Sequence, residues 1–433
     1  MLLIHTSDLH LVPDQFQDTI LESSYYSVLE EISDNVLREK AKYLLISGDM
    51  FNTDRPSMGI VIKTVGVLKK LVDSGVRVIV VPGNHDLSRT RTSVLDLLAR
   101  AGLIHLLDFK EEMGWLILEP LVFQDDRLVF YGVPGFRGSS NREVEYLKHG
   151  TTRFRGLRDY SNYELIILAH INTKFAGYDP SRYSKRYGQL YMEYEDFLHK
   201  LPENTRYIAL GHVHLPIPMD DAFKGKIAYP GAPIGLDTAD LKETFELGKI
   251  GGFRRILRVD LSIETPLVKS LRLENTPRVY YRQLITKSID EAKSEVKKLI
   301  DEVEPGKYTV VLVDVKGLES ASMELENYAL ELMKSYRKMN LFVKIRSTVS
   351  DLEEYAPSID ITPESKELSI EEIELRVIKE YLAKRRINMP PEKIQWLINT
   401  LGQGMSGSVE KVIQEILKEI GGEWWRQGTH TLD

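Results

Sequence analysis

The stretch Leu2-Leu3-Ile4-His5-Thr6-Ser7-Asp8-Leu9-His10 places an Asp-x-His motif directly after an apolar, β-branched run. Runs of this kind predict a buried strand. Further apolar runs are followed by polar motifs in the same way: Tyr43–Ser47 by Gly48-Asp49, Arg77–Val81 by Gly83-Asn84-His85-Asp86, Glu164–Ala169 by His170, and Arg206–Leu210 by Gly211-His212-Val213-His214. In open α/β sheets, ligands bind at the carboxyl ends of the strands. We therefore expect these motifs to meet in one pocket.

The residue types in these motifs suit a pair of divalent metal ions. Two ions about 3.5–4 Å apart can clamp the attacking and leaving oxygens of an in-line phosphoryl displacement. Because dications at that distance repel each other, they need a shared bridge, for which the carboxylate of Asp49 is the candidate. Mixed oxygen and imidazole ligands favour manganese, iron or zinc over calcium, and the absence of Cys excludes thiolate sites. The predicted ligands of one ion are Asp8, His10 and His214, and those of the other are Asn84, His170 and His212.

His85 directly follows Asn84, so we expect it to face the same cavity without binding metal. A protonated imidazole there could stabilise charge at the phosphorus or protonate the leaving oxygen, since its unperturbed pKa is about 6.5. We expect Asp86 either to orient His85 or to cap the following helix. A single His in such a position is more often a hydrogen-bonded core or loop residue than a metal ligand, and we expect this for His5. The complete ordered set indicates a metal site.

The ordered motifs resemble those of the calcineurin-like metallophosphoesterases, and within them the archaeal branch of the Mre-eleven/SbcD DNA double-strand-break repair nucleases. The resembling segments are Ile4–Leu11, Ile46–Phe51, Arg55-Pro56-Ser57, Gly83–Asp86, Gly211–His214 and Tyr229-Pro230-Gly231. The resemblance implies an α/β fold, a layered metallophosphoesterase sandwich. It also implies that His85 is the catalytic residue and that two manganese ions are held by Asp8, His10, Asp49, Asn84, His170, His212 and His214.

The resemblance further implies a DNA nuclease that degrades duplex ends 3′ to 5′ and cuts single strands internally. Its implied partners are DNA, a Rad-fifty/SbcC-like coiled-coil ATPase and a second copy of the chain. Helices at Met58–Asp73 and Thr92–Ala101 would help to form the homodimer, with Leu95, Leu97 and Leu98 as candidate contacts, although we expect most of these leucines to pack in the core instead. Two positions depart from the family: Val12 replaces a usual Gly, and Asn52 replaces a frequent His. Asn52 leaves the balance of exonuclease and endonuclease activity open. The alternatives are a phosphoesterase of small phosphodiesters and a DNA-end-binding scaffold.

Length and composition are those of an ordinary globular chain. The 433 residues suit about three domains, and no apolar run is long enough to span a membrane, so we expect a cytoplasmic, nucleoid-associated protein. The net charge is −7, but residues 351–433 carry 10 basic and 16 acidic residues, which leaves the rest near neutral. Any DNA surface must therefore be local. The candidate cations Lys174, Arg182, Lys185 and Arg186 interleave with aromatic residues that could stack on bases, unless this is simply a solvated surface.

Four regions follow from the pattern. Residues 1–274 alternate strand and helix, and 275–350 form a small β-α-β-α-β unit that resembles the family's DNA-binding cap domain. Within it we expect strands at Val279–Thr286, Tyr308–Val315 and Leu341–Arg346, and helices at Ile289–Val303 and Ser322–Lys338.

The C-terminal regions are an acidic linker at 351–369 and amphipathic helices at 370–433. Nine acidic residues and one basic residue lie between Asp351 and Glu374, a composition that disfavours an ordered core. Helical apolar stripes beyond the linker include Ile373, Val377, Tyr381, Val412 and Ile416. These helices either pack on each other or on the body of the protein, or they bind the ATPase, as the resemblance implies.

Overall fold

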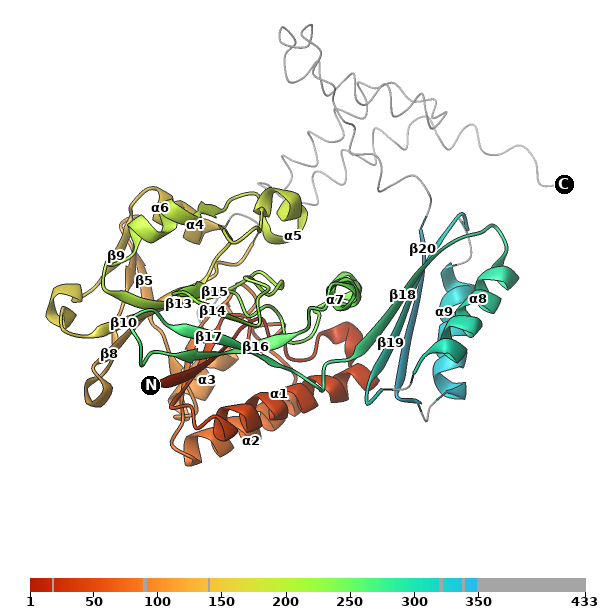
Figure 1. Cartoon of the computed structure of the whole chain (residues 1–433), viewed down its shortest axis with the longest axis horizontal. Coiled ribbons are helices and arrows are strands. Elements are labelled where there is room, and N and C mark those ends of the chain that lie inside the picture. The colour runs from red at the N-terminus through yellow and green to blue at the C-terminus, as the bar shows by residue number, and fades with distance from the viewer. Residues whose placement is uncertain are drawn as a thin grey trace, which may run out of the picture. The chain divides into compact units, whose positions relative to one another are not determined.

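The computed structural model describes residues 1–17, 19–88, 92–138, 141–304, 306–318, 322–336 and 339–348. All of them belong to one compact unit, Met1–Ser350 (Figure 1). The predicted acidic linker and the C-terminal helices, with the five proposed ATPase-binding residues, lie outside these ranges. Within them, no helix is both long and apolar enough to cross a membrane.

Two sheets stacked face to face form the body of the protein. The larger sheet has the order β14-β17-β16-β1-β2-β3-β4, and the smaller one has the order β15-β13-β10-β8-β7. Strands β1 to β4 run parallel, as do β8, β10, β13 and β15. The strands of the larger sheet are β1 Leu2–Thr6, β2 Tyr43–Ser47, β3 Arg77–Val81, β4 His105–Leu106, β14 Ala222–Lys224, β16 Arg255–Asp260 and β17 Leu267–Arg272. Those of the smaller sheet are β7 Leu121–Phe123, β8 Leu128–Val133, β10 Glu164–His170, β13 Thr205–Gly211 and β15 Ile227–Ala228.

Helices and small sheets cover the outer faces of this sandwich (Figure 1). The outer face of the larger sheet packs on α1 Ile20–Arg38, α2 Met58–Asp73 and α3 Val94–Arg100. The smaller sheet packs on α4 Arg142–Lys148 and α6 Tyr194–Lys200, near α5 Ser184–Tyr187, while α7 Thr238–Lys249 leads into β16. The remaining strands of the body are β5 Phe109–Glu112, β6 Trp115–Leu118, β9 Thr152–Phe154, β11 Thr173–Lys174 and β12 Met192–Glu193. The layered α/β sandwich expected from the sequence is therefore confirmed.

Local sequence signals account for most element boundaries. Strands β1, β2 and β3 have the predicted bounds, because each is an uninterrupted buried apolar run. Helix α1 begins at Ile20 because Thr19 is its N-cap and accepts a hydrogen bond from the Leu21 N–H. Helix α3 begins at Val94 because Ser93 and Asp96 form a capping box.

The cap unit is a three-stranded parallel sheet in the order β18-β19-β20. Its elements are β18 Arg278–Ile285, α8 Ile289–Glu302, β19 Thr309–Lys316, α9 Ser322–Ser335 and β20 Leu341–Thr348, which confirms the predicted β-α-β-α-β order. One face of this sheet packs on α8 and α9. Other cap side chains contact the body: the ring of Phe342 lies 5.7 Å from that of Phe16, and the ring of Tyr281 lies 6.0 Å from that of Phe245. The body and the cap therefore form a single unit.

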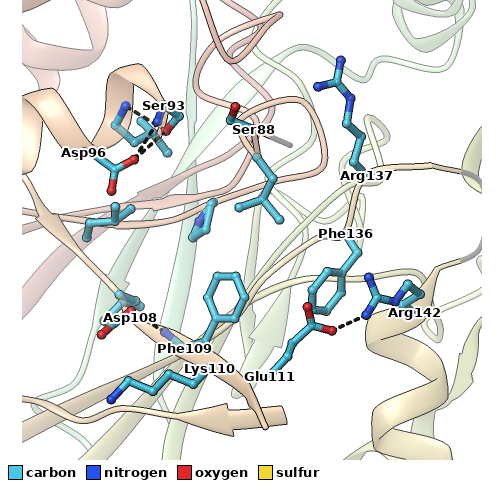
Figure 2. A pocket seen from close by; sticks show the side chains of 15 residues that line it. Ser88, Ser93, Asp96, Asp108, Phe109, Lys110, Glu111, Phe136, Arg137 and Arg142 are labelled. Carbon is cyan, nitrogen blue, oxygen red and sulfur yellow. Dashed lines mark hydrogen bonds and ion pairs between the residues drawn. The ribbon is translucent and has the colours of Figure 1, made fainter. Parts of the chain in front are cut away.

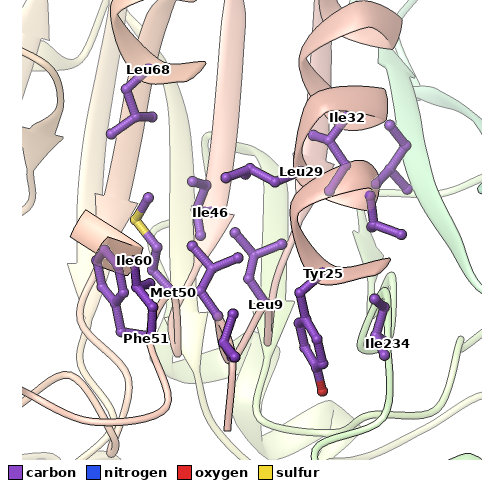
Figure 3. Close-up of a cluster of buried hydrophobic side chains, with 14 of the residues drawn as sticks. Leu9, Tyr25, Leu29, Ile32, Ile46, Met50, Phe51, Ile60, Leu68 and Ile234 are labelled. Carbon is purple, nitrogen blue, oxygen red and sulfur yellow. The ribbon is translucent and has the colours of Figure 1, made fainter. Parts of the chain in front are cut away.

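Buried neighbours anchor the loops that carry the predicted metal ligands. Leu9, Met50 and Phe51 adjoin these ligands in sequence and point into the core beside α1 and α2 (Figure 3). Val213, between His212 and His214, is also fully buried. Each loop is thus held by apolar side chains on one side while its polar side chains turn to the other.

One glycine sets how closely the sheets approach. A Cβ on Gly132, in β8, would lie 2.7 Å from Leu107 Cβ and 2.9 Å from Val81 Cγ2. We therefore expect Gly132→Ala to lower the free energy of unfolding by about 1–3 kcal/mol, measured by thermal or urea denaturation. The matched control is Gly66→Ala in α2, where a Cβ meets nothing within 4 Å. It should raise stability by roughly 0.5–1 kcal/mol, since alanine loses less backbone entropy on folding. Equal effects of the two changes would contradict the packing argument.

Candidate metal centre

The predicted metal ligands gather at one edge of the sandwich. Asp8, Asp49 and Asn84 follow the ends of β1, β2 and β3, while His170 ends β10 and His212 follows β13. His170 pairs with Gly211 in the parallel register of β10 and β13, so the two strands of the smaller sheet end together. Parallel strands therefore bring residues that are far apart in the sequence to one place.

Asp49 lies between two groups of potential ligands. Its Oδ2 is 3.5 Å from His10 Nε2 and 3.3 Å from His170 Nε2. The ligand atoms of Asp8, His10 and His214 lie within 4.8 Å of one another, as do those of Asp8, Asp49 and His170. This is the arrangement that a carboxylate bridge between two ions requires.

The other two predicted ligands adjoin His170. Asn84 Oδ1 is 3.0 Å from His170 Nε2, and the ring centroids of His170 and His212 are 5.1 Å apart. His212 Nε2 lies 3.1 Å from the carbonyl oxygen of Tyr187. If Nε2 carries the proton and donates it there, Nδ1 keeps a free lone pair for a metal.

Burial keeps most of these imidazoles neutral. It lowers the pKa of His10 to about 3 and that of His212 to about 4, and it holds the pKa of His214 well below its usual value. Neutral imidazole is the form that binds a metal ion. These side chains are therefore already in the protonation state that coordination needs.

His170 and the carboxylates behave differently. Burial alone would lower the pKa of His170, but the carboxylates of Asp49 and Asp8 outweigh it and raise the pKa to about 10. Burial raises the pKa of Asp8 to about 6. Burial also opposes ionisation of Asp49, yet the charge of His170 and a hydrogen bond from it hold the pKa of Asp49 well below its usual value. A divalent cation would neutralise the same carboxylates that protonated His170 neutralises. Metal binding would therefore release the proton of His170.

His85 lies at the edge of the cluster and is half-buried. One of its ring nitrogens falls within 4.8 Å of ligand atoms of His10 and Asp49. Its Nδ1 is 2.9 Å from the carbonyl oxygen of Asn52, and its backbone N–H donates to Asp49 Oδ1 at 2.8 Å. Donation from Nδ1 to that carbonyl leaves Nε2 as the nitrogen available for chemistry.

Residues 1–216 match the family model described as calcineurin-like phosphoesterase. The chain belongs to the calcineurin-like phosphoesterases. It is thus a hydrolase of phosphate esters, and its buried Asp and His clusters fit the two-metal site that the family implies.

The relatives of this phosphoesterase include several archaeal proteins called DNA double-strand break repair protein Mre11. The one from Saccharolobus solfataricus is 21% identical over 70% of this chain and 70% of its own length. That of Archaeoglobus fulgidus is 25% identical over 76% of this chain and 73% of its own, and that of Sulfolobus acidocaldarius is 20% identical over 86% and 94%. A solved dimetal phosphatase from Danio rerio covers 53% of this chain and 86% of its own at 12% identity, but its TM-score of 0.29 is too low to support an argument.

The ligand loops of this phosphoesterase are held in an uncommon backbone conformation. The φ angles of Asp8, His10, Asp49 and His212 are 52°, 40°, 50° and 90°. Left-handed conformations of this kind are costly for residues with a Cβ and cluster at functional sites. Val12 has a φ of 47°, a conformation that favours the Gly that the resemblance leads us to expect there; in this chain a buried valine side chain occupies the position.

Glycines make room for the ligands. A Cβ on Gly83 would lie 2.1 Å from Asp49 Oδ1, one on Gly48 would lie 2.1 Å from His170 Nδ1, and one on Gly135 would lie 2.3 Å from His170 Cδ2. The first two glycines belong to motifs that the sequence had singled out. Gly135 was not, because only the fold brings the end of β8 against His170.

Asp86 has a role that was not among the two expected. Its carboxylate is fully buried and accepts hydrogen bonds from the backbone N–H groups of Met50, Phe51 and Gly83. It therefore ties the loop after β2 to the loop after β3, rather than orienting His85 or capping a helix. His5, in contrast, is the hydrogen-bonded core residue that was predicted, and it contacts Tyr207 and Leu210.

Asp240 and Tyr187 are site residues that the sequence did not indicate. Asp240, in α7, is buried, and its Oδ2 lies 2.9 Å from His214 Nδ1. The hydroxyl of Tyr187 accepts a hydrogen bond from the backbone N–H of His214 at 3.1 Å. Asp240 follows the N-cap Asp237 by three residues and accepts a hydrogen bond from the Leu236 N–H at 2.8 Å. Its spacing therefore signals a helix start, and nothing in the sequence indicates its contact with His214.

The predicted DNA-binding segment is only partly exposed. Lys174, Arg182 and Lys185 have accessible side chains, and their role stays a prediction. Arg186 instead forms ion pairs with Asp240 and Glu243 of α7. Of the aromatic residues between these cations, Phe175, Tyr178 and Tyr187 are buried in the layer that covers the smaller sheet, so they are not available to stack on bases. Tyr183 and Tyr191 are partly exposed, and stacking on them stays a prediction.

A cavity of about 680 Å³ adjoins the metal centre (Figure 2). Pro82, Leu87 and Phe136, which line it, flank the Gly83–Asp86 loop and Gly135 in sequence. Phe109 and Leu87 present apolar surface, while Arg142 pairs with Glu111 at its edge. The volume is in the range of pockets that take a small ligand.

The contact of Asp240 with His214 makes a testable difference to metal binding. A carboxylate behind a metal-ligating imidazole fixes its orientation, and its loss typically costs about 10–100-fold in affinity. We expect Asp240→Asn to weaken Mn²⁺ binding by that order, measured by calorimetric titration. Glu246→Gln, on the exposed side of the same helix, is the control and should bind as the parent does. Equal affinity in Asp240→Asn and the parent would mean that Asp240 only holds α7.

Proposed function

We propose that this phosphoesterase is a manganese-dependent DNA nuclease that processes double-strand breaks in complex with a Rad-fifty/SbcC-like ATPase. Its activities would be 3′ to 5′ exonuclease action on duplex ends and endonuclease action on single strands. The observation that carries the proposal is the buried pair of clusters around Asp49 in a chain whose relatives are described as DNA double-strand break repair proteins. The cap unit packed against the body supports it, since a small phosphodiester needs no such addition.

The residues around the centre have distinct tasks in this reaction. When bound, a metal pair supplies a clamp for the attacking and leaving oxygens of the phosphodiester. Asp49 lies centrally, and Asp8, His10, Asn84, His170, His212 and His214 would hold the ions around it. Manganese is the proposed ion because this donor set mixes hard oxygen and borderline nitrogen ligands. The full burial of Asp8 and His10 excludes bulk water from the inner side of the centre.

His85 is the proposed catalytic residue. The Asn52 carbonyl fixes its ring through Nδ1, so that Nε2 can hold a proton for the leaving oxygen or stabilise developing charge. Because the partner is a backbone carbonyl, this orientation does not depend on the side chain at position 52. The change from His to Asn there thus leaves the His85 contact intact.

A homodimer is the proposed assembly. On α2, Met58 and Ile62 are each 66% exposed, and on α3 Leu97 is 55% exposed. Leu95 and Leu98 are core residues instead, as the core-packing alternative predicted. Exposed apolar side chains on two neighbouring helices favour a protein partner. We further propose that the protein acts in the cytoplasm, at the nucleoid.

The first test is Mn²⁺-dependent cleavage of an end-labelled duplex by the parent and by His85→Ala. We expect the variant to lose about 10²–10⁴-fold in rate while calorimetry shows Mn²⁺ bound as in the parent. His149→Ala, which removes an exposed histidine, is the control and should cleave normally. A His85→Ala variant that cleaves at the parental rate would overturn the role of His85. A parent that hydrolyses only small phosphodiesters would overturn the nuclease.

The second test concerns the ATPase. A fragment ending at Ser350 contains the whole compact unit with the metal centre. It should keep the nuclease activity and lose binding to the Rad-fifty/SbcC-like ATPase, as measured by co-sedimentation or calorimetry with the purified partner. Undiminished binding by the fragment would place the docking surface outside residues 370–433.

A further inference from the structure

A second cavity, of about 500 Å³, lies where the cap joins the body. It is bordered by the C-terminal half of α7, the end of β17 and the residues that enter β18 and β19. None of the predicted metal ligands lines it. We call this cavity the joint groove.

Exposed cations surround the joint groove on separate segments. Lys249 ends α7, Arg272 ends β17, Arg278 begins β18 and Lys307 precedes β19. Because these side chains come from four places in the chain, they suit a ligand with several phosphates better than a single anion.

Carboxylates near these cations do not close the groove. Lys249 lies 3.1 Å from Glu246, Arg272 lies 3.7 Å from Glu274, and Arg278 lies 3.7 Å from Glu304. These acidic side chains are all solvent-exposed, and exposed pairs of this kind contribute only about 0–1 kcal/mol. Lys307 Nζ donates to the Asn275 side-chain oxygen at 2.8 Å and lies 5.6 Å from the ring centroid of Tyr308, and both of these partners are neutral. Phosphate oxygens can therefore replace these partners at little cost.

Half-buried aromatic rings lie between the cations. Phe245, Phe253 and Tyr280 all line the groove. Lys249 Nζ is 4.4 Å from the ring centroid of Phe245, and the Arg272 guanidinium is 5.4 Å from that of Phe253. A basic groove with interleaved aromatic rings is how proteins bind single strands, since phosphates contact the cations and bases stack on the rings.

The floor of the groove is connected to the metal centre. Arg254, a buried lining residue, donates from Nη1 to the carbonyl oxygen of His214 at 2.6 Å and from Nη2 to that of Asp240 at 2.9 Å. Arg254 thus holds both the backbone of His214 and helix α7, and a strand bound in the groove would lie next to Arg254.

We propose that the joint groove binds single-stranded nucleic acid outside the metal centre. Its phosphates contact Lys249, Arg272 and Lys307, and its bases stack on Phe253 and its aromatic neighbours. The inference rests on the proposed function for the class of ligand, but binding in the groove requires neither metal nor cleavage. The groove thereby gives this enzyme a second contact with the strand, beside the helix that supports His214.

The experiment measures binding of a fluorescein-labelled oligothymidylate of about 12 nucleotides to the full chain in EDTA, across a salt series. The test variant is Lys249→Ala/Arg272→Ala/Lys307→Ala. The matched control, Lys69→Ala/Arg158→Ala/Lys298→Ala, removes the same number of charges from positions that do not line the groove. We expect the test variant to bind about tenfold or more weakly, with a salt slope reduced by about 2, since each phosphate contact to a single strand contributes about 0.7.

Two further measurements separate the possible outcomes. Hydrolysis of bis-p-nitrophenyl phosphate with Mn²⁺ should be equal in the parent and the test variant, because this small substrate does not need the groove. A parent that cleaves no DNA with Mn²⁺ would overturn the proposed function and leave the binding result standing. Phe253→Leu should weaken oligonucleotide binding but not binding of inorganic tripolyphosphate. Equal losses of oligonucleotide affinity in the test and control variants would overturn the proposal, because binding would then depend on general surface charge. Tripolyphosphate that competes as well as the oligonucleotide would also overturn it, because the groove would then be an anion site only.

Discussion

The burial of two carboxylates at the carboxyl ends of β1 and β2 is the constraint on which this structure depends. Asp8 and Asp49 are almost completely removed from water, and a buried negative charge is strongly unfavourable unless it is paired. The surrounding imidazoles cannot all carry a charge, because burial keeps His10, His212 and His214 neutral. A divalent pair satisfies the carboxylates and uses the neutral imidazoles as ligands at the same time, which is why the donor set fits metal ions better than a network of salt bridges.

The rest of the fold keeps these groups close together. Gly48, Gly83 and Gly135 allow backbone to approach the ligand side chains, and Asp86 ties two of the ligand loops to each other. Apolar neighbours such as Leu9 and Met50 fix the same loops to the core. The left-handed conformation of Asp8, His10, Asp49 and His212 is maintained by this packing. The packing of the fold thus offsets the backbone strain of the loops that carry the predicted ligands.

Helix α7 connects the metal centre to the cap. Asp240 contacts His214, and Lys242 and Phe245, further along the helix, contact Tyr281 of the cap sheet. Arg254 joins the helix to the backbone of His214. The helix and Arg254 therefore connect the joint groove and the cap to the backbone of His214, a predicted metal ligand.

The sequence by itself determined the strands β1, β2 and β3, the β-α-β-α-β order of the cap and the identity of the residues that cluster around Asp49. Buried strands are continuous apolar runs, and polar motifs at their ends are visible without knowing what they face. Only the tertiary structure decided the supporting residues: Asp240 behind His214, Gly135 against His170, and Arg186 paired with α7 rather than free for DNA. It also buried Phe175, Tyr178 and Tyr187, three of the aromatic residues expected to stack on bases. The physical reason is that the periodicity of apolar residues in the sequence indicates which side of a helix or strand is buried. A contact such as that of Asp240 with His214, 26 residues apart, depends instead on how the layers pack on each other.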